Sequence, residues 1–204
     1  MKIVSLLPSA TEIVSSIGLK DKLVGVSHEC DYPKDISHLP KLTSSRVHNN
    51  LNSKEINESI NILLKNSLSI YQVDIEVLKI LNPDFILTQS QCDICAVSIE
   101  QVKSCLENVL LKNTKIIDLQ ATNLKEILDD IRKCGKILSK TSEANTIVDK
   151  FDFKTKQVKK KIKNKHKKKV LCIEWIHPIM LAGNWMPDLI HNVNSISVAT
   201  TSGK

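Results

Sequence analysis

The stretch that decides the fold is KIVSLLPSATE, residues 2–12. Its apolar run from Ile3 to Leu7 is closed by Pro8, which is typical of a short strand buried in a parallel sheet. Ser9 or Thr11 can cap a following helix, and Glu12 stands three residues after Ser9, the spacing of a capping box. Gly18 is a suitable residue to end that helix. The start of the chain is therefore predicted to be a strand, a sharp turn and a helix.

The same pattern recurs along the first 122 residues. Strands are predicted at residues 23–26, 85–88 and 115–118, and the helices between them at 56–64, 77–81 and 97–107, with residues 34–52 irregular. Alternation of strands and helices indicates a three-layer α/β lobe with a mainly parallel sheet. Loops that follow parallel strands meet at one edge of the sheet. We therefore expect the loops at residues 8–9, 28–33 and 89–95 to converge there.

The rest of the chain predicts a connector and part of a second lobe. Residues 123–168 have a helical pattern that ends in many lysines, and residues 169–204 hold a strand at 170–173, a helix at 187–193 and a strand at 196–198. One strand–helix–strand piece cannot bury a core of its own. The expected fold class is α/β, with two lobes linked by a long helix and the second lobe incomplete in this chain.

Charge and motifs exclude several classes of function. The formal net charge is +7, but ten lysines and no acid fall between Lys154 and Lys169, and the remaining chain is mildly acidic. That segment lacks the aromatic interleaving or recognition motif of a nucleic-acid binder, so we interpret it as a solvated helix face, not a patch for nucleic acid or an anionic membrane. Phosphate-loop, dinucleotide, zinc-protease and serine-hydrolase motifs are missing from the sequence, which predicts a protein that is not an enzyme.

The sequence shows no targeting segment. No apolar run approaches the ~18 residues that cross a bilayer, and no signal peptide precedes Ile3. The chain as written is therefore expected in the cytoplasm, where its six cysteines stay reduced or bind a metal.

Several motifs in the same order resemble one family. They are residues 2–12, VGVSHECDYP at 24–33, NPDFILTQ at 82–89, CDICAVS at 92–98, EW at 174–175 and AGNWMP at 182–187. Together they resemble the cobalamin-binding substrate-binding proteins of ABC transporters, in the iron and cobalamin group of periplasmic binding proteins. The resemblance implies two α/β lobes joined by one long helix, a corrinoid held between them, delivery to an ABC permease without catalysis, and a periplasmic or membrane-associated location. It also implies a complete second lobe, most of which this chain lacks.

Candidate ligand contacts follow from the resemblance and from side-chain chemistry. The resemblance implies first-lobe contacts by Pro8, Ser9, Ala10, Tyr32, Gln89 and Ser90. Trp175 and Trp185 offer broad, stiff apolar surface for a corrinoid, with packing in the core as the alternative. Glu29 and Glu174 are candidate contacts to the arginines of a permease, with ordinary exposed carboxylates as the alternative.

Cysteines suggest a second hypothesis. Cys92 and Cys95 form a C-x-x-C motif, and His28 and Cys30 lie in a loop predicted at the same sheet edge. Four such ligands suit tetrahedral zinc, or one of them can cap cobalt or haem iron. The alternatives are a redox dithiol and simple packing. The second functional hypothesis is thus a cytoplasmic metal- or haem-handling protein, with zinc or iron bound; the third is a thiol enzyme. In all three cases we expect a monomer, and the binding hypothesis requires no cofactor.

Overall fold

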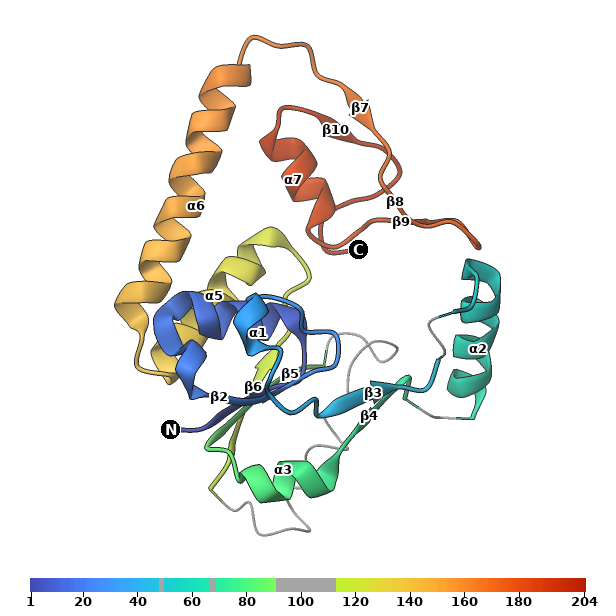
Figure 1. Ribbon diagram of the computed structural model, residues 1–204. Helices are drawn as coiled ribbons and strands as arrows, with labels where there is room; N and C mark the ends of the chain where they lie inside the picture. The colour runs from blue at the N-terminus through green and yellow to red at the C-terminus, as the bar shows by residue number, and fades with distance from the viewer. Residues whose placement is uncertain (48–49, 67–68, 91–112) are drawn as a thin grey trace. The chain divides into compact units, whose positions relative to one another are not determined.

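The computed structural model describes residues 1–47, 50–66, 69–90 and 113–204 (Figure 1). They form two compact units, one of Met1–Leu51 and Glu58–Gln120 and the other of Asn52–Asn57 and Ala121–Lys204. The predicted helix at residues 97–107 and most of the loop at 89–95 lie outside the described residues.

A four-stranded parallel sheet is the centre of the first unit. Its order is β2 (Leu23–Val26), β1 (Ile3–Ser5), β5 (Phe85–Gln89) and β6 (Lys115–Leu119). All three residues of β1 are buried, as expected for a strand covered on both faces. The four predicted strands and their parallel pairing are confirmed, so the apolar runs were a sound guide to this sheet.

Helix α1 (Pro8–Val14) follows β1 directly, but it does not use the predicted capping box. It begins at Pro8, which tolerates the first turn because it has no N–H to leave unpaired, and no side chain caps it. Ser9 and Glu12 therefore stand inside the helix, and the capping-box prediction is wrong. A wide turn, Ser15–Leu19, follows α1, and within it Gly18 has φ of +80°, the left-handed conformation that favours glycine and breaks the helix. Here the predicted helix end is confirmed.

A short antiparallel pair lies beside this sheet in the same unit. Strand β3 (Thr43–Ser45) pairs with β4 (Tyr71–Val73), and helix α3 (Ile75–Leu81) follows. Asp74 caps α3 by accepting from the Val77 N–H, and Asn82 ends it before Pro83, as predicted. Leu42 and Leu78 join Val4, Leu6 and Ile86 in a buried apolar cluster. β3 was missed because Thr-Ser-Ser has no apolar alternation.

The remaining elements of the first unit and of the segment near its boundary are short. A single turn of 3-10 helix, Lys20–Lys22, precedes β2, and another spans Lys34–Ile36. Helix α2 (Ser53–Lys65) confirms the predicted helix at residues 56–64. Asn52 caps it by accepting from the Lys54 and Glu55 N–H groups, and Glu55 accepts from the Asn52 N–H in return.

In the second unit the expected helical stretch is two helices. α5 (Leu124–Ile137) and α6 (Thr141–Ile162) are separated by a short turn in which Ser139 has φ of +59°. The sequence pattern predicted one continuous helical stretch because no glycine or proline marks the turn at residues 138–140. The two helices approach closely at Gly135, where an added Cβ would lie 2.3 Å from the Ala144 Cβ.

Four short strands and one helix complete this unit. β7 (Lys169–Val170) pairs in parallel with β10 (Ile196–Ser197), and β8 (Ile173–Trp175) forms a hairpin with β9 (Met180–Leu181). Helix α7 (Met186–Asn192) stands before β10. The α/β class is confirmed in both units. Among the described residues, no helix is long and apolar enough to cross a membrane.

Candidate functional site: a cavity at the sheet edge

A cavity of about 360 Å³ opens at the carboxyl ends of β1, β2 and β5 in the first unit. The described residues that line it are Leu6, Leu7, Pro8, Ser9, Ser27, Glu29, Thr43, Tyr71 and Gln89. Residues of the loops at 8–9 and 28–33 and the last residue of β5, Gln89, contribute to this set, as expected for loops that meet at one edge; residues 91–95 of the third loop lie outside the described residues. A cavity with mainly apolar walls and a few polar groups is the usual form of a small-molecule site.

Backbone contacts explain why these residues meet. The Leu6 N–H donates to the Leu87 carbonyl at 2.9 Å, which carries the β1–β5 ladder to the point where the chain turns into α1. The Leu42 N–H donates to the Val26 carbonyl at 2.8 Å, and the Val26 N–H donates to the Pro40 carbonyl at 3.0 Å. These contacts bring β3 next to the end of β2 and place Thr43 at the cavity.

His28 is held by a polar network at this edge. Its Nδ1 lies 2.6 Å from the Thr43 hydroxyl oxygen, which also accepts from the His28 backbone N–H at 3.0 Å. The Ser27 and Thr43 hydroxyls are 2.9 Å apart. The buried Nε2 is 3.1 Å from a Glu29 carboxylate oxygen, at ion-pair distance without hydrogen-bond geometry, and the ring meets Tyr71 edge to face at 5.3 Å. Nδ1 thus faces the Thr43 hydroxyl, whereas Nε2 is buried beside the Glu29 carboxylate with no hydrogen-bond partner among the described residues.

Cys30 is directed away from the cavity and under α1. Its Sγ lies 3.1 Å from the Thr11 hydroxyl, which in turn donates to the Ser5 hydroxyl at 2.8 Å. Burial raises the pKa of the Cys30 thiol, whereas a metal ligand has to be a thiolate. Within the described ranges, no three histidine, cysteine or acidic side chains are grouped to hold a metal ion. Cys92 and Cys95 lie outside the described residues, so the four-ligand cluster stays a prediction.

The other predicted first-lobe contacts differ in placement. Pro8, Ser9 and Gln89 line the cavity, but Ala10 is fully buried inside α1 and Tyr32 is 61% exposed. Ser90 instead ties β5 to β6, since its N–H and hydroxyl donate to the two oxygens of Asp118 at 2.8 and 2.6 Å.

Sequence reasoning missed Thr43 and Tyr71. The signal that could have found Tyr71 is the alternation of Tyr71, Val73 and Ile75 with polar residues, which is typical of a strand. No local pattern marks Thr43, because its pairing with β4 and the bond of the neighbouring Leu42 to Val26 bring it to the cavity.

The predicted second-lobe residues all belong to the second unit. Trp175 is half-buried, and its indole N–H donates to the His177 carbonyl at 2.9 Å within the β8–β9 hairpin. Trp185 is 37% exposed just before α7, and Glu174 is exposed on β8. These three residues stay predicted contacts.

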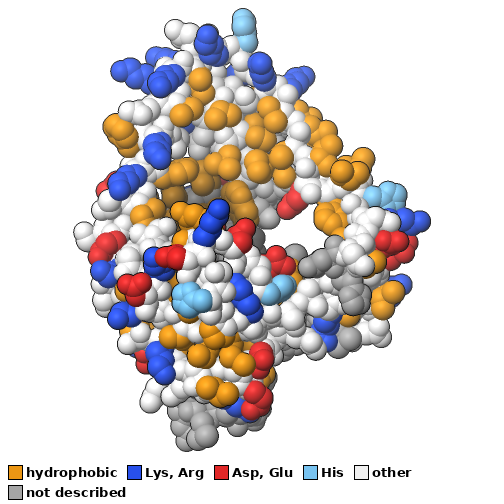
Figure 2. Space-filling model, viewed as in Figure 1, with side chains coloured by type: hydrophobic (Ala, Val, Ile, Leu, Met, Phe, Trp, Pro, Cys, Tyr) orange, Lys and Arg blue, Asp and Glu red, His pale blue; other side chains and the backbone are white. Residues whose placement is uncertain are grey.

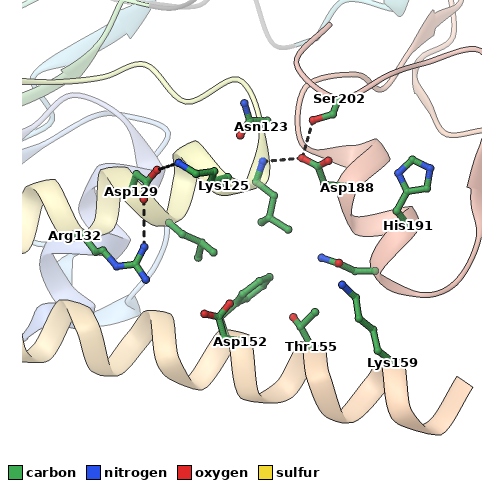
Figure 3. A pocket seen from close by; sticks show the side chains of 14 residues that line it. Asn123, Lys125, Asp129, Arg132, Asp152, Thr155, Lys159, Asp188, His191 and Ser202 are labelled. Carbon is green, nitrogen blue, oxygen red and sulfur yellow. Dashed lines mark hydrogen bonds and ion pairs between the residues drawn. The ribbon is translucent and has the colours of Figure 1, made fainter. Parts of the chain in front are cut away.

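A second cavity, of about 600 Å³, lies among α5, α6 and α7 (Figure 3). Lys125 and Arg132 both point to Asp129, at 2.6 and 3.2 Å, and the hydrogen bond from Lys125 holds the pKa of Asp129 below its usual range. Asp188 accepts from the Leu124 N–H and the Ser202 hydroxyl, both at 2.9 Å, and so caps α5 from α7. Asp129 is paired with two cations and Asp188 accepts two hydrogen bonds, which indicates a structural role for these two carboxylates.

The fold agrees with a comparison to known families. A model described as periplasmic binding protein matches residues 3–204, and the chain belongs to this family. Periplasmic binding proteins of ABC transporters bind their ligands and do not convert them.

Two curated proteins show the relationship in sequence. The uncharacterized ABC transporter substrate-binding lipoprotein YvrC of Bacillus subtilis is 30% identical over 176 residues, which cover 85% of this chain and 46% of that protein. The vitamin B12-binding protein of Vibrio parahaemolyticus is 46% identical over 43 residues, or 21% of this chain and 16% of that protein. The chain therefore spans less than half the length of the curated relatives it matches.

Solved structures share the fold at lower identity. A possible iron-binding (periplasmic solute-binding) protein from Staphylococcus epidermidis has a TM-score of 0.70 at 22% identity, covering 96% of this chain and 66% of that one. The vitamin B12 binding protein BtuF of Vibrio cholerae has a TM-score of 0.66 at 20% identity, and the match covers 98% of this chain and 67% of that one. A periplasmic heme binding protein from Pseudomonas aeruginosa has a TM-score of 0.66 at 18% identity, and the match covers 99% of this chain and 64% of that one.

Proposed function

We propose that this protein binds cobalamin or a related corrinoid and delivers it to an ABC permease without chemical conversion. The observation that carries the proposal is the cavity at the carboxyl ends of β1, β2 and β5, where Pro8, Ser9 and Gln89 meet in a periplasmic binding fold. Family membership supports a binding role, and the 43-residue match to a vitamin B12-binding protein supports the ligand.

The charge of the cavity favours a corrinoid over haem. Among the described lining residues, Glu29 is the single charged side chain, and no lysine or arginine is present. The two propionates of a haem would meet an acid and no cation there. A corrinoid carries carboxamide side chains, which can pair with the hydroxyl of Ser9 and the amide of Gln89. The lining is therefore suited to a neutral or cationic ligand.

The size of the cavity implies further contacts. At about 360 Å³ it is near the low end of small-molecule pockets, and a corrinoid is too large to be enclosed by it. We assign further ligand contacts to Trp175 and Trp185, which supply wide aromatic surface at little cost in side-chain entropy. Glu29 and Glu174 are proposed to contact the permease. A periplasmic or membrane-anchored location is proposed from the lipoprotein relative.

The test is a titration of the purified chain with cyanocobalamin, which is neutral overall, and in parallel with haemin. We expect saturable one-to-one binding of cyanocobalamin by calorimetry and visible absorbance, weakened by Ser9→Ala and Gln89→Ala. Preferential binding of haemin would contradict the charge argument. Stoichiometric zinc or iron that is lost in Cys92→Ser/Cys95→Ser, with no corrinoid binding, would support the metal-handling alternative instead.

A further inference from the structure

The geometry points to a membrane-docking surface, in contrast to the solvated helix face expected from the sequence alone: the lysine-rich half of α6 and the segment after it bind the anionic headgroups of a phospholipid bilayer. This inference does not depend on the ligand of the sheet-edge cavity. It concerns the ten lysines between Lys154 and Lys169, which we call the basic segment. Figure 2 shows lysine side chains gathered over this part of the molecule.

The basic segment is part of the folded unit. Asn194, after α7, donates from its side-chain amide to the carbonyls of Ile162 and Lys165 at 3.3 and 3.0 Å. The Ile196 N–H donates to the Lys168 carbonyl at 2.8 Å, and β7 then pairs with β10. The lysines after α6 are thus held on a fixed backbone, so their charges act on a partner as one surface.

The lysines are exposed and have no acidic partners among the described residues. No ion pair within the described ranges includes a lysine of the basic segment, although Lys125 and Lys140 in the same unit are paired. From Lys154 to Lys163 the helix rises about 14 Å, little more than the Debye length of ~10 Å at 0.1 M salt. Neighbouring charges therefore reinforce one another, and an anionic surface relieves their repulsion.

One face of the basic segment also carries an exposed aromatic ring. Phe153 is 62% exposed, and Lys156, Lys160 and Lys163 follow it three, seven and ten residues later, which places all four on one stripe of α6. The opposite stripe packs inward, with Ala144 and Val148 buried. An apolar ring among lysines is typical of helices that lie in the bilayer interface. Nucleic-acid surfaces stack bases on several aromatic side chains, whereas this stripe has one, so a membrane is the better match.

The experiment is co-sedimentation of the full chain with vesicles of phosphatidylcholine alone and of phosphatidylcholine mixed with phosphatidylglycerol. We expect binding to the mixed vesicles only, and loss of most binding at ~1 M salt, where the Debye length is ~3 Å. Lys156→Gln/Lys160→Gln/Lys163→Gln should lower the partition coefficient about 100-fold, because each lysine near an anionic surface contributes a factor of about five. Phe153→Ser should lower it about tenfold.

The matched control is Lys22→Gln/Lys34→Gln/Lys115→Gln, which changes the net charge by the same amount at exposed lysines of the first unit. It should bind mixed vesicles within a factor of ~3 of the unchanged chain. Equal losses in the two triple variants would overturn the inference, because net charge would then be the cause. Binding to a DNA duplex without binding to vesicles would overturn it in favour of nucleic acid. An unchanged affinity in Phe153→Ser would overturn the choice of a membrane over a soluble polyanion.

Discussion

Replacing Gly135 by alanine tests the packing of α5 on α6, because helix propensity and packing predict opposite signs. Gly135 is buried inside α5. In an unconstrained helix, Gly→Ala stabilises by about 1 kcal/mol. Here the new Cβ would lie 2.3 Å from the Ala144 Cβ and 2.9 Å from the Lys140 carbonyl oxygen. Neither atom is the end of a flexible side chain, so the helices themselves must separate.

The expected change in stability is the cost of overpacking minus the gain in helix propensity. Overpacking of this kind costs up to about 3 kcal/mol, and the gain in propensity offsets about 1. We therefore expect Gly135→Ala to lower the free energy of unfolding by about 2 kcal/mol. Ala144→Gly in the same chain removes the closer contact, so the double variant should recover part of the loss and give a measurable coupling energy.

The assay is urea unfolding followed by tryptophan fluorescence. Both tryptophans of the chain, Trp175 and Trp185, lie in the same unit as α5 and α6, so their emission reports on that unit. Lys136→Ala, at an exposed neighbouring position, is the control and should change stability little. If Gly135→Ala were more stable than the unchanged chain by about 1 kcal/mol, the close approach of the two helices would be refuted.

Four further outcomes are expected. Asp188→Ala should lower the stability of the second unit by about 1–2 kcal/mol in the same fluorescence assay, since the Leu124 N–H and the Ser202 hydroxyl both lose their acceptor; Asp188→Asn, which keeps an acceptor oxygen, should lose less. Thr43→Val should weaken cyanocobalamin binding about tenfold in calorimetry, because His28 and Ser27 lose the hydroxyl that holds them beside Glu29. An unchanged affinity would show that this hydrogen-bond network does not contribute to ligand binding. Burial raises the pKa of Cys134 to about 12 and also raises that of Cys30. Both thiols should therefore resist alkylation by iodoacetamide at pH ~8 until the protein is unfolded, as measured by peptide mass spectrometry. Fast labelling in the folded chain would contradict their burial. The Thr122 N–H and hydroxyl lower the pKa of Glu126, so the stability that this carboxylate contributes is present above pH ~5 and lost as the pH falls below ~4. Glu126→Gln should therefore be less stable than the unchanged chain at neutral pH. A stability difference that persists at pH ~2 would show that it does not come from the ionised carboxylate.

The sequence by itself determined the strands of the first sheet and the edge of that sheet where a cavity opens. Apolar runs such as Ile3–Leu7, each ended by a proline, a glycine or a polar loop, can be satisfied only by burial on both faces, which requires a parallel sheet with helical connections. Since the loops after parallel strands share one edge, Pro8, Ser9 and Gln89 were brought together in prediction without any coordinates.

Only the tertiary structure decided which side chains at that edge face the cavity. Cys30 and Glu29 are adjacent in one polar loop, yet the thiol turns under α1 to Thr11 while the carboxylate remains at the cavity. Tyr71 and Thr43 reach the site through an antiparallel pair whose partners are far apart in the sequence. The close approach of α5 and α6 at Gly135 and Ala144 is likewise a contact that no local pattern records. Periodicity reports whether a residue is buried, but the direction of its side chain depends on contacts between distant segments, and these exist only once the chain has folded.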